Sequence, residues 1–178
     1  MQILIVLLAW TLATTATSPS MPAALASGAT PQRSDPVLVR SVLDGDTIDV
    51  AGVGRVRLLG IDAPERAHGL DTAAPFANEA REKLISLVLH RWVRLEADVE
   101  KLDGYNRHLA YVVREDGLFV NAELVRDGLA RVSARLRLAR LAELKRAEAE
   151  AQRARRGMWG QAPAVHAPGY TRRRRSNP

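Results

Sequence analysis

Apolar and polar residues alternate along several short stretches of the chain, and this two-residue period is typical of half-buried β-strands. The pattern covers residues 36–43 and both ends of residues 48–61, where Gly52 and Gly54 predict a hairpin turn. An Asp-Gly dipeptide at positions 44–45 breaks the first stretch. Further strands are expected at residues 91–98, 108–115 and 118–120.

Apolar residues spaced three and four positions apart predict three helices. The first is expected to begin at Pro75, since proline is favoured at the first helical position, and to run to about His90. Asn121 is expected to cap a short second helix that Gly128 ends. A third, longer helix is expected from about Leu136 to Arg156. The apolar face of the first helix consists of Phe76, Ala80, Leu84, Leu87 and Val88, and that of the third consists of Leu141, Leu144, Ala147 and Ala151.

The order of these elements predicts the fold class. Strands come first, one helix interrupts them, and helices end the domain, which disfavours repeated βαβ units. A five-stranded barrel with a helix between its third and fourth strands is the plan of the OB-fold. We therefore expect an α+β fold, a five-stranded OB-fold β-barrel with three packed α-helices.

The two ends of the chain differ in composition from the middle. Residues 3–13 form a short apolar run, too short for the roughly 20 residues that span a bilayer and typical of a secretory signal. We expect a signal peptide at 1–26, a linker at 27–36, one domain at 37–160 and a basic, disordered tail at 161–178. No stable membrane span is expected after signal cleavage, and secreted or periplasmic localisation follows, with an uncleaved N-terminal anchor as the alternative.

Charge is distributed unevenly along the 178 residues, whose formal net charge is +6. Residues 37–134 carry 13 Lys and Arg against 16 Asp and Glu, whereas residues 135–157 carry eight bases and three acids. A basic flank attracts polyanions, and local acids can hold a cation. The chain has no cysteine, which excludes disulfides, thiolate metal sites and a cysteine nucleophile.

Four acidic residues stand where strands meet turns. Asp44 and Asp46 flank a glycine, and Asp62 and Glu65 flank Ala63 and a proline that stiffens the chain. Carboxylates and backbone carbonyls suit Ca²⁺, and Asp46 and Asp62 could share one cation if their strands are neighbours. Taken singly, each pair fits an ordinary solvated turn equally well or better.

Two arginines and a tyrosine complete the candidate residues. Arg57 precedes Asp62 on a strand, and its planar guanidinium is suited to holding a phosphate oxygen. Arg107 lies in a turn that runs into a strand, and Tyr105 beside it could stack on a base or pack on the barrel. Each arginine, considered alone, also fits a solvated surface position.

Five motifs, in order and with their spacing, resemble the staphylococcal-nuclease-like (thermonuclease) family. They are D-G-D-T at Asp44–Thr47, R-L-L-G-I-D-A-P-E at Arg57–Glu65, G-Y-N-R-H-L-A-Y at Gly104–Tyr111, L-V-R-D-G-L-A-R-V at Leu124–Val132 and R-G-M-W-G at Arg156–Gly160. Together they extend over most of residues 37–160.

The resemblance implies an enzyme that hydrolyses DNA and RNA phosphodiesters with Ca²⁺, and we expect it to be a monomer. Position 63 is alanine where the family's best-known members have threonine, and Ser133 and Ala134 stand where a second nucleotide-contacting tyrosine is expected. Carried over by motif, Asp46 and Asp62 would be metal ligands with the Ala63 carbonyl, and Asp44 would lie in the outer shell. Glu65 would be the general base, or would position the attacking water. Arg57 and Arg107 would bind the scissile phosphate, and Tyr105 would bind substrate.

Two other functions remain open from the sequence. The same barrel can bind nucleic acid without cutting it, as a non-catalytic OB-fold module. The basic helix and Arg172–Arg175 could instead attach an envelope-associated protein to acidic surfaces. Cleavage in the presence of Ca²⁺ would separate an enzyme from the first, and truncation after Gly160 would test the second.

Overall fold

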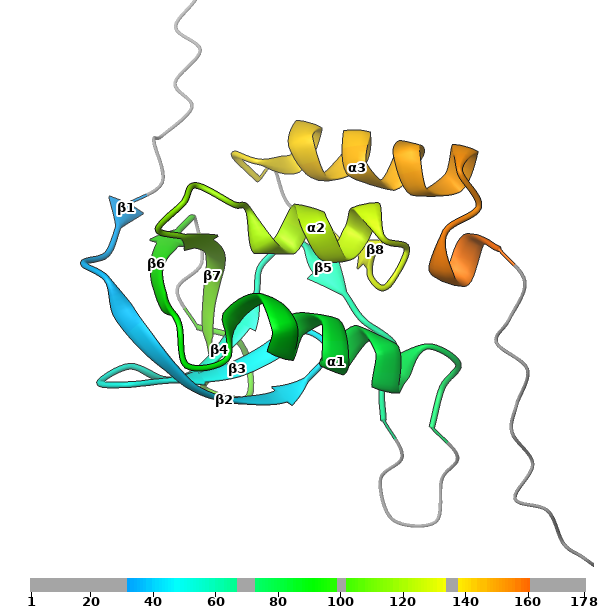
Figure 1. Cartoon of the computed structure of the whole chain (residues 1–178). Coiled ribbons are helices and arrows are strands. Elements are labelled where there is room, and N and C mark those ends of the chain that lie inside the picture. The colour runs from blue at the N-terminus through cyan, green and yellow to red at the C-terminus, as the bar shows by residue number, and fades with distance from the viewer. Residues whose placement is uncertain (1–31, 67–72, 99–101, 134–137, 161–178) are drawn as a thin grey trace, which may run out of the picture.

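The computed structural model describes residues 32–66, 73–98, 102–133 and 138–160 (Figure 1). The expected signal peptide at 1–26 and the basic tail at 161–178 lie outside these ranges. Gln32–Arg33, inside the expected linker, forms strand β1 and pairs with β6 (Trp92–Ala97). Strand pairing therefore starts before residue 37.

Five strands close into a barrel. Strand β2 (Val37–Asp44) pairs with β3 (Thr47–Val50), β3 with β4 (Gly54–Leu58), and β4 with β7 (His108–Arg114). Strand β6 pairs with both β7 and β2 and closes the ring. Only β4 and β7 run parallel among these pairs. The predicted α+β fold with a five-stranded OB-fold barrel and three helices is confirmed.

A second, two-stranded sheet lies beside the barrel and bears on the site. Strand β5 (Ile61–Asp62) follows β4 after Gly60, whose φ is 80°. It pairs antiparallel with β8 (Arg131–Val132), and the register sets Asp62 opposite Arg131. The end of β4 and the segment that follows α2 are thereby joined.

Two helices pack against the barrel, and a third packs on the second of them (Figure 1). Helix α1 (Ala77–Val88) contacts β2, α2 (Val120–Arg126) contacts β7 and α1, and α3 (Leu141–Arg153) packs on α2. A 3₁₀ turn, η1 (Gly157–Trp159), ends the described chain. No helix in the described ranges is long and apolar enough to cross a bilayer.

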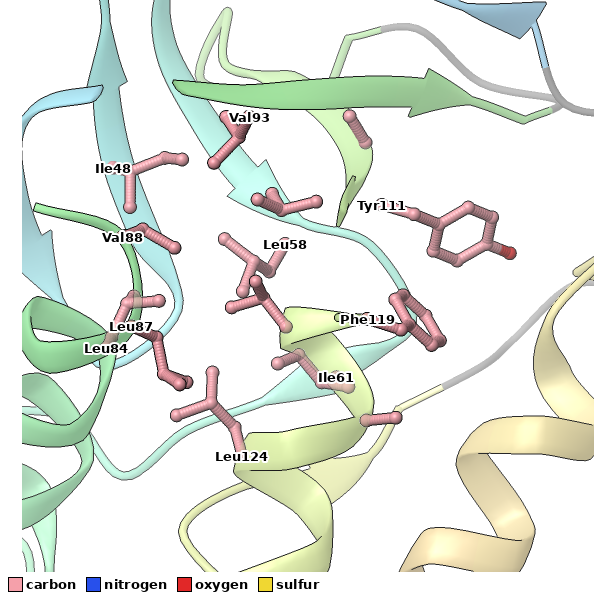
Figure 2. Close-up of a cluster of buried hydrophobic side chains, with 14 of the residues drawn as sticks. Ile48, Leu58, Ile61, Leu84, Leu87, Val88, Val93, Tyr111, Phe119 and Leu124 are labelled. Atoms are coloured by element: carbon pink, nitrogen blue, oxygen red, sulfur yellow. The ribbon is translucent and has the colours of Figure 1, made fainter. Parts of the chain in front are cut away.

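One hydrophobic core joins the barrel to the helices (Figure 2). The alternation of β4 places Val56 and Leu58 inside, with no exposed surface, and Arg55 and Arg57 on the other face. Burying such side chains contributes roughly 1.5–3 kcal/mol each. The core holds the strand ends in place. Residues from the barrel, from β5 and from the first two helices contribute to it: Ile48, Leu58, Ile61, Leu84, Leu87, Val88, Val93, Tyr111, Phe119 and Leu124.

Three predicted elements differ from those in the structure. Helix α1 begins at Ala77, not at Pro75, because Phe76 takes a left-handed conformation with φ 68°. Residues 118–120 are not a strand: Phe119 makes a single bridge with Val113, and Val120 already begins α2. The third helix is shorter than predicted and covers Leu141–Arg153.

Asn121 is not the cap of α2 but a buried residue of its first turn. Its side-chain oxygen accepts a hydrogen bond from the Val112 N–H at 3.0 Å, and its amide donates to the Leu59 carbonyl at 2.9 Å. Asn121 has no exposed surface. It therefore joins α2 to β7 and to the segment that leads into β5.

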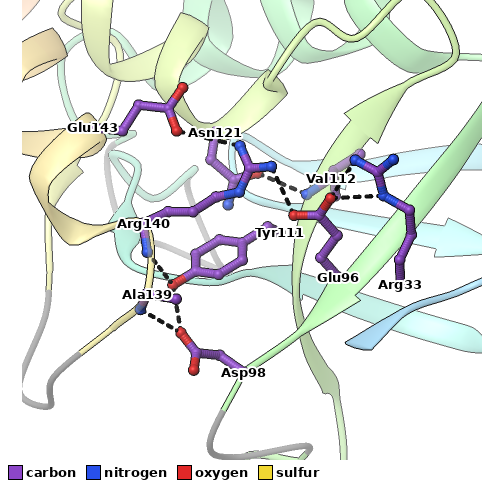
Figure 3. Close-up of polar contacts among 9 residues, drawn as sticks. All are labelled: Arg33, Glu96, Asp98, Tyr111, Val112, Asn121, Ala139, Arg140 and Glu143. Atoms are coloured by element: carbon purple, nitrogen blue, oxygen red, sulfur yellow. Dashed lines mark hydrogen bonds and ion pairs between the residues drawn. The ribbon is translucent and has the colours of Figure 1, made fainter. Parts of the chain in front are cut away.

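A polar cluster fixes the segment before α3 on the barrel (Figure 3). Glu96, 4% exposed, makes ion pairs with Arg140 at 2.8 Å and Arg33 at 2.6 Å. The Arg140 guanidinium also lies 4.3 Å from the centre of the Phe119 ring. Asp98 accepts hydrogen bonds from the Tyr111 hydroxyl and the Ala139 N–H, both at 2.8 Å.

Candidate active site

The turn between β2 and β3 carries the first two acids. Gly45 lies so close to its surroundings that an added Cβ would be 2.8 Å from the Cβ atoms of both Ala63 and Ala80. Only glycine therefore lets the turn lie this near to the Asp62–Glu65 segment and to α1. Asp46 is 8% exposed, whereas Asp44 is half-buried and pairs with Arg66 at 3.0 Å.

Arg57 joins the acids of the two segments. One terminal nitrogen donates to Asp62 Oδ1 at 2.6 Å, and the other lies 3.2 Å from Asp46 Oδ2 and donates to the Ile61 carbonyl. The Ala63 N–H also donates to Asp46 Oδ2, at 3.3 Å. The expectation that Asp46 and Asp62 lie on neighbouring strands is wrong, because Asp46 lies in a turn and Asp62 lies in β5, which pairs with β8. Their shared partner Arg57 nevertheless brings the two carboxylates close together.

Arg107 is held by an acid that the sequence reading did not single out. Asp103 accepts hydrogen bonds from the Arg107 guanidinium at 2.7 Å and from the Arg107 and Tyr105 N–H groups. Tyr105 is 84% exposed and therefore does not pack on the barrel, but its ring lies 5.3 Å from the Arg107 guanidinium carbon.

A single hollow of about 130 Å³ brings nearly all the predicted site residues together. Tyr105 is the exception, since it lies outside the lining. The hollow is small, below the roughly 300–1,000 Å³ of typical ligand pockets, and suits a phosphate group and a cation better than a whole nucleotide. Its lining contains Asp44, Asp46, Arg57, Asp62, Ala63, Glu65 and Arg107.

A sequence model of the family described as "Staphylococcal nuclease homologue" matches residues 55–161, more than half of the chain. The chain belongs to this family. The match includes Arg57, the Asp62–Glu65 segment and Arg107, and begins after the Asp44–Asp46 turn.

Individual members of the family show how far the similarity extends. The chain is 40% identical to the thermonuclease of Staphylococcus intermedius over 102 residues, which are 56% of this chain and 60% of that protein. It is 33% identical to the thermonuclease of Staphylococcus hyicus over 66% of this chain and 72% of that protein. A probable endonuclease, LCL3, of Verticillium alfalfae is 41% identical over 51% of this chain and 30% of its own length.

Burial dominates the electrostatics of Asp46 in this family member. Loss of solvent raises the pKa of the Asp46 carboxyl, and the negative Asp62 adds to the rise. The Arg57 charge and the hydrogen bonds from Ala63 and Thr47 act in the opposite direction without cancelling it. A second positive charge near Asp46 and Asp62 would therefore stabilise both carboxylates in their ionised form.

The oxygen atoms of Asp46 and Asp62 fit a cation that binds two protein carboxylates and completes its shell with other oxygen ligands. In the described part of the chain, no three acidic, histidine or cysteine side chains are grouped as metal ligands. Asp46 and Asp62 line one hollow of about 130 Å³. Ca²⁺ accepts carboxylates together with water and backbone carbonyls. Arg57 occupies the space between the two carboxylates in this structure.

Three positioning residues were missed from the sequence. Asp103 stands four residues before Arg107, and an aspartate beginning a turn is a recognisable signal for such backbone hydrogen bonds. Thr47, the last residue of the D-G-D-T motif, donates to Asp46 Oδ1 at 2.9 Å, but the motif alone assigned it no role. Asn121 carries no comparable signal, because its two partners lie far away in the sequence.

Proposed function

We propose that this protein is an exported, Ca²⁺-dependent endonuclease that hydrolyses phosphodiester bonds of DNA and RNA. One observation carries the proposal: a single small hollow contains three aspartates, a glutamate and two arginines. The names of the relatives, thermonuclease and probable endonuclease, support the same reaction class. The match covers 60% of the length of the first relative and 30% of the length of the other. That this chain has the activity named for these proteins is therefore part of the proposal.

Asp46, Asp62 and the Ala63 carbonyl would hold the cation, with Asp44 in the outer shell. When bound, Ca²⁺ supplies positive charge that stabilises the negative charge developing on the attacked phosphate. Asp44 is already engaged with Arg66, which orients its carboxylate beside the turn.

Glu65 would act as the general base toward the attacking water. It is exposed, lines the hollow, and follows a proline. The Glu65 carbonyl accepts a hydrogen bond from the Ala74 N–H at 3.0 Å, which fixes its backbone while the side chain faces solvent. A carboxylate in reach of water typically contributes a factor of about 10²–10⁴ in rate.

Arg57 and Arg107 would bind the scissile phosphate, with Tyr105 against the neighbouring nucleotide. Asp103 keeps the Arg107 guanidinium in one position before substrate arrives, so less ordering entropy is lost on binding. Arg57 would have to exchange its contacts with Asp46 and Asp62 for the phosphate. A cation held by those carboxylates would favour this exchange, because the cation and Arg57 would compete for the same oxygens.

Export rests on the sequence of residues 1–26, and a monomeric state is part of the proposal. Both need separate tests: the mass of the mature protein in the medium or periplasm, and its mass in solution.

The nuclease proposal is tested by time courses on single-stranded DNA, duplex DNA and RNA, with Ca²⁺ and with a chelator. We expect the wild-type protein to cleave these substrates with Ca²⁺ and not with the chelator, and we expect Asp46→Asn to lose this cleavage. Asp49→Asn, three residues further on in β3, is the matched control, because among the described residues Asp49 pairs only with the exposed Arg40 and it lies outside the hollow. Binding without cleavage under any divalent cation would favour the non-catalytic module instead.

A further inference from the structure

A second, larger cleft of about 440 Å³ adjoins the hollow. The two share one wall, formed by Asp62, Ala63 and Pro64. The cleft continues from this wall to the start of α1 and to η1, and neither Arg107 nor Tyr105 lines it. Its volume lies in the range of about 300–1,000 Å³ typical of sites that hold a small molecule or one of its units.

Arg131 supplies a fixed positive charge in this cleft. Its Nε–H donates to the Met158 sulfur at 3.0 Å, and its guanidinium carbon lies 5.3 Å from the centre of the Trp159 ring. Strand pairing sets it opposite Asp62, a proposed metal ligand. Within the described residues Arg131 has no carboxylate within 4.0 Å, unlike Arg57 and Arg107, so its charge is available to an anionic ligand.

The rest of the cleft offers an apolar surface. Pro75 and Phe76 lie on one side and Met158 on another. Phe76 has φ 68°, an unusual conformation for a bulky residue and one that is commoner at functional sites than elsewhere. A flat, apolar group with a nearby negative charge would therefore match the chemistry of the cleft.

We propose that this cleft binds the nucleotide next to the scissile phosphate, with its base against Phe76 and its phosphate at Arg131. The inference rests on the proposed nuclease function and assigns a second subsite to it. The 130 Å³ hollow has room for a phosphate but not for a base, so the chain of the substrate must continue onto a neighbouring surface. The shared Asp62–Pro64 wall makes this cleft a direct continuation.

The experiment compares kcat/KM for a single-stranded dinucleotide with that for oligonucleotides extended by one nucleotide on either side. The gain is defined as kcat/KM for the extended oligonucleotide divided by kcat/KM for the dinucleotide. Because the gain is a ratio, it is independent of each variant's basal rate. Arg131→Gln is expected to reduce the gain about 10–100-fold, as for loss of one charge-assisted hydrogen bond. Arg91→Gln is the matched control: it removes the same charge at an exposed position that lines a different hollow.

Two further readouts separate a phosphate contact from a structural role. The slope of log kcat/KM against log salt should fall by about 0.7 in Arg131→Gln, as for one phosphate contact on a single strand, and Arg131→Lys should restore most of it. Phe76→Leu should lower the gain for a normal extending nucleotide but not for an abasic one, since only the former has a base to stack.

The outcomes distinguish the two proposals. If the wild-type protein cuts, and Arg131→Gln and Arg91→Gln have the same gain and salt slope, the subsite is refuted while the nuclease stands. If the folded wild-type protein cuts no nucleic acid, both proposals fail. A lower gain and slope confined to the Arg131 variant supports the subsite.

Discussion

Gly45→Ala should displace the residues of the site without replacing any residue to which we assign a role in binding or catalysis. The new Cβ would lie 2.8 Å from two other Cβ atoms, at least 0.6 Å inside the ordinary contact range that begins at 3.4 Å. Ala80 has no exposed surface and Ala63 is 7% exposed, so neither side can move easily. The turn carrying Asp44 and Asp46 must therefore shift away from the Asp62–Glu65 segment.

The magnitude follows from the displacement. Overpacking of this kind typically costs about 1–3 kcal/mol of unfolding free energy. A displacement of about 1 Å at a catalytic site can cost a factor of about 10² in rate. We therefore expect the Ca²⁺-dependent kcat/KM to fall by about 10–100-fold.

Urea denaturation and initial cleavage rates measure the two effects on the same preparations. Gly104→Ala is the control, because no atom lies within 4 Å of its added Cβ and its φ is not positive. It should change stability by less than about 1 kcal/mol. A Gly45→Ala protein with wild-type stability and wild-type kcat/KM would refute the close-approach reasoning.

Three further predictions concern residues that hold the site or the helices in place. Asn121→Ala should lower the unfolding free energy by about 2–4 kcal/mol in urea denaturation, because two buried backbone groups lose their partners; an unchanged midpoint would contradict this. Glu96→Gln should cost about 2–3 kcal/mol by the same assay, since Arg140 loses its buried partner; Glu115→Gln, at an exposed turn, is the control. Burial raises the pKa of the Asp103 carboxyl, but the hydrogen bonds from Arg107 outweigh burial and hold this pKa below 3.8. The ionised carboxylate therefore stabilises the fold above that pH, and the stabilisation is lost in more acidic solution. Asp103→Asn should therefore flatten the acid limb of thermal stability below about pH 4, and an unchanged limb would contradict this.

The strands of the barrel could be predicted because their alternation is local and is reinforced by turn residues. The start of α1 could not, because proline at position 75 satisfies the usual rule while the left-handed Phe76 delays the helix. The apolar run at residues 118–120 fits a strand or a buried helix start equally well, and packing against β7 decides between them.

The candidate site was predicted more completely than its supports. Asp46, Asp62 and Glu65 stand at motif positions whose spacing carries the resemblance, and the structure places them in one hollow. The bridge made by Arg57 depends on how β4 and β5 turn in space, which no local pattern reports. The position of Arg131 depends on a pairing of two-residue strands, too short to leave a periodic signal.

The most direct test of the account measures the single-turnover cleavage rate and the affinity for the same single-stranded oligonucleotide in Glu65→Gln, with Ca²⁺ present. The matched control is Glu82→Gln on the exposed side of α1. The account predicts a rate lower by about 10²–10⁴ in Glu65→Gln, with affinity within a few-fold of wild type and no change in Glu82→Gln. A Glu65→Gln protein that cuts at the wild-type rate would contradict the assignment of this hollow as a hydrolytic active site with a glutamate base.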